Sequence, residues 1–113
     1  MRQKKLATVV FVDEKTQKAF DLLMQGTFAE KELHQSIKKT VLDLFENPAA
    51  GIQIRHNLWP KEYTEKYQIN NLWKYNLPNG WRLIYTIKDE ELLIVSIILE
   101  WFPHKEYEKR FGY

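Results

Sequence analysis

The chain lacks cysteine, has few glycines and carries little net charge, and each shortage excludes a class of structure or site. Without cysteine, disulfides and thiolate metal sites are impossible, and a cytoplasmic protein is the default expectation. The four glycines are scattered, so the sequence contains no glycine-rich phosphate loop. A net charge of +2, from 17 basic and 15 acidic residues, means that any affinity for nucleic acid must come from a local patch.

The sequence also lacks a long apolar run and a metal-binding spacing. A membrane span takes roughly 18 apolar residues or more. The longest run here, residues 92–99, is interrupted by Ser96 and has the length of a strand. His34, His56 and His104 are too far apart in sequence to form a local metal motif. We therefore expect no membrane partner, no metal and no other cofactor.

The N-terminus is basic and then apolar, as the start of a signal peptide would be. Its apolar part is short, rich in β-branched residues and followed at once by Asp13 and Glu14. These features favour a first strand over residues 6–12. The strand has no clear alternation of polar and apolar residues, so we expect it to be buried on both faces.

Two helices with a very short link are predicted after this strand. Asp13 is placed to cap the first helix, which ends at Gly26. Thr27 and Glu30 match the capping-box pattern T-x-x-E at the start of the second helix. That helix ends before Pro48, and apolar residues recur at helical spacing through both helices. The pattern is typical of two antiparallel helices that pack on a core.

The remainder of the chain is predicted to consist mainly of strands. A short strand is expected at residues 52–55, a weakly helical piece at 60–67, a β-hairpin at 72–85 and a final, central strand at 91–101. With 113 residues, the chain fits one domain, residues 1–113. The order β-α-α-β-β-β-β predicts an α+β fold, in which two N-terminal antiparallel helices pack on one face of a small, mostly antiparallel β-sheet.

The predicted hairpin, LWKYNLPNGWRLIY, contains an arginine among apolar neighbours. Asn79 and Gly80 accept positive φ and so predict the turn. In the second arm, Arg82 shares a face with Ile84 and lies opposite Trp81, Leu83 and Tyr85. Two explanations for Arg82 stay open. It either reaches the rim and pairs with a carboxylate such as that of Glu100, or it is directed at an anion.

The order of elements, together with W-R-L-I-Y in a late strand and H-K-E-Y-E-K after the last strand, resembles the RelE/ParE toxin superfamily, in particular RelE- and HigB-like toxins. The resemblance covers nearly the whole chain. It implies the toxin component of a type II toxin–antitoxin system, a ribosome-dependent, metal-independent mRNA endoribonuclease that inhibits translation. In such cleavage the ribose 2′-OH attacks the adjacent phosphate. The implied partners are a cognate antitoxin, the ribosome and mRNA, with a possible homo-oligomer or hetero-oligomer with the antitoxin.

The resemblance also implies roles for individual residues. Arg82 would hold the scissile phosphate, because its planar guanidinium meets two phosphate oxygens at once. His104 would act as base or acid, and Tyr107 would stack on a base or orient the phosphate. The residues expected to give further electrostatic support or to bind RNA are Lys74, Lys105, Arg55 and Arg110.

Two alternative functions stay open within the same superfamily. One is a ParE-like toxin that inhibits DNA gyrase without ribonuclease chemistry, although such members generally lack the histidine and tyrosine found here after the last strand. The other is an inactive binding protein of the same fold. Asn76 stands where many members carry an arginine, and one catalytic cation is therefore missing from the pattern.

Overall fold

The computed structural model describes residues 5–112, which form one five-stranded sheet and four α-helices. The strands are β1 (Leu6–Phe11), β2 (Ile52–Gln53), β3 (Trp73–Asn76), β4 (Trp81–Asp89) and β5 (Leu93–Pro103). The helices are α1 (Glu14–Leu22), α2 (Phe28–Glu46), α3 (Lys61–Tyr67) and α4 (His104–Phe111). Within residues 5–112, no helix is both long and apolar enough to cross a membrane.

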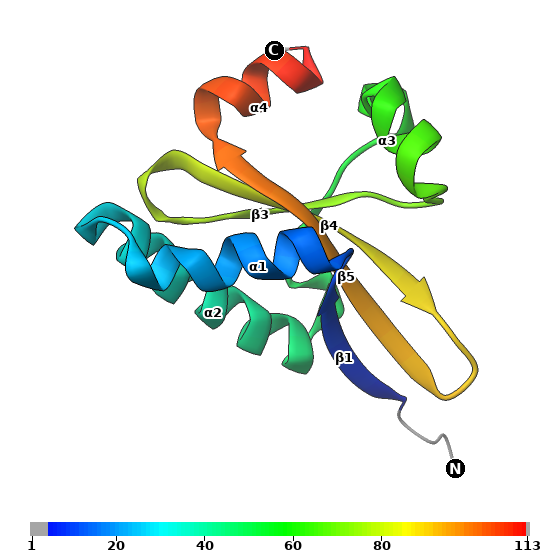
Figure 1. Ribbon diagram of the computed structural model, residues 1–113. Coiled ribbons are helices and arrows are strands. Elements are labelled where there is room, and N and C mark those ends of the chain that lie inside the picture. The colour runs from blue at the N-terminus through cyan, green and yellow to red at the C-terminus, as the bar shows by residue number, and fades with distance from the viewer. Residues whose placement is uncertain (1–4, 113) are drawn as a thin grey trace.

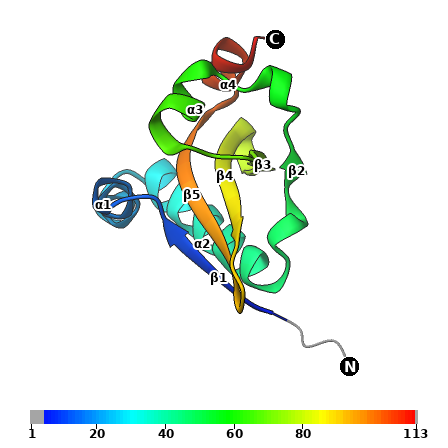
Figure 2. The same ribbon diagram turned by 90° about the vertical axis from the view of Figure 1, so that its right-hand side faces the viewer.

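The strands are ordered β1-β5-β4-β3-β2, and every neighbouring pair is antiparallel except β1 and β5. The predicted α+β class and mostly antiparallel sheet are therefore confirmed. The predicted central position of the last strand is also confirmed, since β5 lies between β1 and β4. Figures 1 and 2 show α3 and α4 together at one end of the molecule, away from the turn that joins β4 to β5.

The sheet separates two apolar clusters. On one face, Leu33, Ile37 and Leu44 of α2 pack against Leu83 and Tyr85 of β4. The other face holds a cluster built from α3, α4 and the sheet, with Tyr63, Ile84, Phe102, Tyr107 and Phe111 among its members. Alternation along β4 sends successive side chains to opposite clusters, as the hairpin pattern predicted.

The predicted helix starts are confirmed by their capping hydrogen bonds. Asp13 Oδ1 accepts from the backbone N–H of Thr16 at 2.8 Å. The side chain of Thr16, together with this backbone bond, holds the pKa of Asp13 below its usual value. At α2 the backbone N–H of Glu30 donates to Thr27 Oγ1, and the backbone N–H of Thr27 donates to Glu30 Oε1. Both halves of the capping box are therefore formed.

Two sequence-based expectations about the ends of the chain need correction. β1 is an edge strand rather than one buried on both faces, and Leu6 and Val10 are 74% and 42% exposed. The segment after β5 forms helix α4, which the predicted order of elements omitted. Its signals were present: Pro103 stands just before the helix, Gly112 follows it at φ 74°, and side chains four residues apart pair along it.

Tyr85 ties the end of α2 to the middle of the sheet. Its hydroxyl donates to the carbonyl of Pro48 at 2.8 Å and accepts from the N–H of Gly51 at 3.0 Å. Gly51 permits this approach, since a Cβ there would lie 2.5 Å from the carbonyl oxygen of Lys74. Tyr85 is fully buried, so the two backbone groups depend on its hydroxyl.

We expect Tyr85→Phe to lower the free energy of unfolding by about 1–3 kcal/mol, because the change leaves two part-buried backbone groups without their partner. Urea titration followed by tryptophan fluorescence measures the loss. Tyr67→Phe is the control, since Tyr67 is half-buried and its hydroxyl bonds to no backbone group of residues 5–112. Equal stability of the two variants would contradict this account of Tyr85.

The raised pKa values of two tyrosines lead us to expect a loss of stability at alkaline pH. A hydrogen bond to Asp43 raises the pKa of Tyr75 to about 12, and burial raises the pKa of Tyr85 to about 12. Between pH ~10 and ~12 the unfolded chain loses protons that the folded chain keeps, so the free energy of unfolding falls as pH rises. Urea titrations between about pH 8 and 11 should show this fall, with a smaller slope in Tyr85→Phe. A flat profile would be inconsistent with both assignments.

Candidate functional site

The turn between β3 and β4 fixes the position of Arg82. Asn79 and Gly80 adopt φ values of 61° and 79°, as the Asn-Gly pair predicted. The N–H of Leu77 donates to the carbonyl of Trp81 at 2.8 Å and closes the turn. Arg82 lies opposite Asn76 in the ladder and projects toward α4. The turn also reaches the start of α4, since a Cβ on Gly80 would lie 3.6 Å from His104 Cβ.

Arg82 is a half-buried cation without a carboxylate partner among residues 5–112. Its Nη1 donates to the carbonyl of Trp81, and its Nη2 donates to His104 Nδ1, both at 3.1 Å. Its Nε is buried and donates to no atom of the described chain. The first of the two explanations left open by the sequence does not hold, because Glu100 pairs with Arg110 instead.

His104 is the first residue of α4 and contacts charged groups on both sides of its ring. Nδ1 faces Arg82, and Nε2 lies 2.5 Å from Glu108 Oε1, one helical turn further along. No side chain caps the start of α4, so the unpaired N–H groups of its first turn point toward the same end as His104. Such a helix start favours an anion nearby.

Tyr107 lies beneath the cations rather than beside them. It is 2% exposed and stacks on Phe111 with ring centroids 4.5 Å apart. Lys74 Nζ lies 4.7 Å and Arg82 Cζ lies 6.0 Å from the centroid of its ring. The structure therefore gathers Lys74, Arg82, His104 and Tyr107, but it leaves no exposed ring face on Tyr107 for a nucleobase. The ring instead supports the two cations from below.

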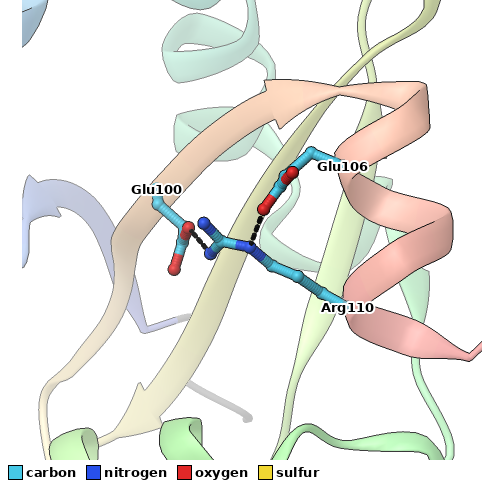
Figure 3. A network of polar contacts seen from close by, with 3 residues as sticks. All are labelled: Glu100, Glu106 and Arg110. Carbon is cyan, nitrogen blue, oxygen red and sulfur yellow. Dashed lines mark hydrogen bonds and ion pairs between the residues drawn. The ribbon is translucent and has the colours of Figure 1, made fainter.

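Arg110 holds α4 against the sheet (Figure 3). Its guanidinium is ion-paired with Glu100 of β5 and donates from Nε to Glu106 at 2.9 Å. It also lies 4.7 Å above the ring of Phe102. Although desolvation opposes the charge, Glu106 and Glu100 outweigh it and raise the pKa of Arg110. Two carboxylates thus already neutralise this arginine, and we leave it out of the phosphate site proposed below.

The other two basic residues that the sequence singled out lie apart from this group. Lys105 is exposed on α4 beside His104, without a contact to Arg82. Arg55 is exposed before a short turn and lines a cavity of about 350 Å³ with His56 and Trp59. No hydrogen bond, ion pair or ring contact within the described chain links Arg55 to the cluster of Lys74, Arg82, His104 and Tyr107.

His104 is the exposed member of the cluster, with 49% of its side chain exposed. Two further cavities, of about 750 and 330 Å³, are lined by residues of other regions, and neither Arg82 nor His104 lines them. Across residues 5–112, no three His, Cys, Asp or Glu side chains gather as metal ligands would. What the cluster offers chemically is an arginine with unused donor capacity, a lysine and a histidine, which suits a phosphate ester better than a metal ion.

Sequence reasoning missed Glu108, the carboxylate that contacts His104. The signal was the spacing, since residues four apart on a helix face each other. That spacing was hidden because the segment after β5 was not predicted to be helical.

A family model described as ParE toxin of type II toxin-antitoxin system, parDE, matches residues 12–99 of the chain. No curated protein and no solved structure matches it. The matched range contains Lys74 and Arg82 and ends before α4. The family match therefore includes the hairpin half of the cluster, whereas His104 and Tyr107 lie beyond it.

We expect Arg110→Ala to loosen α4 and to lower the free energy of unfolding by about 1–3 kcal/mol, since it removes charge-assisted bonds to two carboxylates. Hydrogen exchange of α4 amides should accelerate more than that of α2 amides. Arg110→Lys keeps the charge but loses the planar fork, so its α4 exchange rates should lie between those of wild type and of Arg110→Ala. Unchanged exchange in α4 would show that apolar packing alone holds the helix.

Proposed function

The chain belongs to the ParE toxin family of type II toxin–antitoxin systems, within the RelE/ParE superfamily that its sequence resembles, and we propose that it cleaves mRNA on the ribosome. The observation that carries this proposal is the uncompensated charge of Arg82. A half-buried guanidinium normally finds a carboxylate, as Arg110 does ten residues from Glu100. Arg82 instead contacts a neutral carbonyl and a histidine ring, which leaves donor capacity for a phosphate.

The neighbours of Arg82 fit the demands of ribonucleolytic cleavage. Attack by the ribose 2′-OH on the adjacent phosphate builds negative charge on the phosphoryl oxygens and requires a base for the hydroxyl proton. Arg82 and Lys74 supply positive charge for the first demand. His104, in contact with Arg82, supplies a titratable nitrogen for the second. The ring of Tyr107 lies under both cations and separates them from the apolar core.

The exposure of His104, whose side chain is 49% exposed, supports dependence on the ribosome. Enclosed sites bury most of a ligand and hold it by their own walls. Arg82 and His104 line none of the three cavities of about 750, 330 and 350 Å³, so the walls of those cavities do not hold a substrate against them. We propose that the ribosome holds the mRNA strand and presents its backbone to this surface, in the cytoplasm where translation takes place.

An antitoxin is the partner that membership of this family implies. We propose that it covers the apolar side chains left exposed where α1 and α2 meet, namely Leu22, Met24 and Phe28. Large apolar side chains that are exposed and close together in the chain favour a binding surface. An amphipathic helix or an extended segment of the antitoxin would bury it.

Cleavage of mRNA by wild-type protein added to translating ribosomes tests the proposal. We expect Arg82→Ala to slow cleavage by about 100- to 1,000-fold, as loss of a preorganised donor to developing negative charge does elsewhere. Arg82→Lys should recover only part, because lysine lacks the planar fork. Lys18→Ala is the control, since it removes a positive charge from an exposed position on α1. Cleavage that survives Arg82→Ala would refute the site.

Inhibition of DNA gyrase is the second candidate, and the match to the ParE family model favours it. A supercoiling assay with the same protein preparations separates the two functions. If the protein blocks supercoiling and leaves ribosome-bound mRNA intact, gyrase inhibition replaces the present proposal. If it does neither, the chain is a binding protein of the same fold.

A further inference from the structure

We propose that Glu108 is the positioning residue that orients His104 and makes its Nδ1 the basic nitrogen of the site. This inference rests on the function proposed above. It assigns a role to a residue that lies outside the range matched by the family model. The His104 ring makes two contacts, at 3.1 Å to Arg82 Nη2 and at 2.5 Å to Glu108 Oε1.

Arg82 and Glu108 together dictate which ring nitrogen carries the proton. A guanidinium nitrogen only donates hydrogen bonds, so His104 Nδ1 must present its lone pair to Arg82. In the neutral ring the proton is then on Nε2, where the carboxylate of Glu108 accepts it. One neighbour donates and the other accepts, and the two contacts select the same tautomer.

Substrate binding releases Nδ1 for chemistry. When a phosphate takes the donors of Arg82, the lone pair of Nδ1 becomes available beside it. As the 2′ oxygen bonds to phosphorus, the hydroxyl proton moves to Nδ1, and the bond from phosphorus to the 5′ oxygen breaks. The expelled 5′ oxygen takes a proton from water. Glu108 retains its bond to Nε2–H and stabilises the positive charge that the ring gains.

The pair differs from an ordinary surface ion pair on a helix. Lys18 with Glu14 and Lys61 with Glu65 have the same four-residue spacing, but their side chains are 66–89% exposed and their separations are 3.1 and 3.8 Å. The side chains of His104 and Glu108 are 49% and 46% exposed, and their separation is shorter. Exposed pairs of the first kind contribute little. The His104 ring also differs from the two lysines in that a second nitrogen, Nδ1, is held by Arg82.

Nuclear magnetic resonance of the His104 ring in the full chain tests the orientation without reference to activity. In wild type we expect a downfield, slowly exchanging Nε2 proton bonded to Glu108. Glu108→Ala should lose this resonance, whereas Arg82→Ala should keep it. Glu65→Ala is the control, because it removes a glutamate from a pair of the same spacing on α3. An unchanged Nε2 resonance in Glu108→Ala would overturn the proposal.

Kinetics on ribosome-bound mRNA test the proton transfer. Positioned proton transfer contributes about 10²–10⁴-fold to rate, so His104→Ala should lose this factor and Glu108→Ala a part of it, roughly 10- to 100-fold in kcat with KM unchanged. Glu108→Gln should keep the Nε2 bond through its amide oxygen and still lose rate, because it lacks the charge. Wild-type rates in both Glu108 variants would overturn the catalytic part of the inference.

The two measurements separate failure of the proposed function from failure of the role given to Glu108. If the wild-type protein cleaves no RNA, the proposed function and the proton transfer at Nδ1 both fall. The Nε2 resonance still decides whether Glu108 orients His104 in that case. If wild type cleaves RNA and the Glu108 variants match it in both measurements, the function stands and the role of Glu108 is refuted.

Discussion

The anchoring of α4 to the sheet is the constraint on which the candidate site depends. Arg110 bridges Glu100 of β5 and Glu106 of α4, while Tyr107 and Phe111 enter the apolar cluster beneath. Tyr63 of α3 lies beside this ion pair. Burial, with a further contribution from Glu100, raises the pKa of Tyr63 above its usual value, so its hydroxyl stays protonated there. Without these contacts His104 would have no fixed place relative to Arg82, since the two come from different elements.

Two arginines on the same side of the sheet differ in their partners, and this difference identifies the candidate site. Arg110 has two carboxylates and holds structure together. Arg82 has none among the described residues, although its guanidinium is half-buried and one of its donors is unused. An uncompensated cation in such a place opposes folding, so stability does not explain its presence. Because it lies beside a histidine, a lysine and the start of a helix, we propose that it binds a phosphodiester.

Local sequence signals predicted much of the fold. The helix caps at Asp13 and Thr27 and the turn at Asn79 and Gly80 follow from side-chain chemistry within four residues, and all appear in the structure. The superfamily was recognised from the order of elements together with W-R-L-I-Y in a late strand and H-K-E-Y-E-K after the last strand, and the match to the ParE family model confirms it. The edge position of β1 was not predictable in this way. An apolar strand has the same composition at the edge of a sheet as in its middle, and only long-range pairing separates them.

The site was predictable in part, for the same reason. Alternation along β4 correctly placed Arg82 on the face opposite Leu83 and Tyr85. Its lack of a carboxylate partner could not be predicted, because it depends on the long-range ion pair between Glu100 and Arg110. The burial of Tyr107 and the contact of Glu108 with His104 both required the helical form of the final segment. Residues of that segment were named individually from resemblance, whereas their mutual geometry comes from the helix.

We propose that Arg82 and His104 act on a phosphodiester through its neighbouring ribose hydroxyl. The chemical ends of mRNA fragments produced on ribosomes distinguish this reaction from other cleavage. We expect a 2′,3′-cyclic phosphate on one fragment and a 5′-hydroxyl on the other, and no cleavage when a single 2′-deoxy nucleotide stands at the cut. Cleavage that tolerates the 2′-deoxy nucleotide, or mRNA that stays intact while gyrase is inhibited, would contradict it.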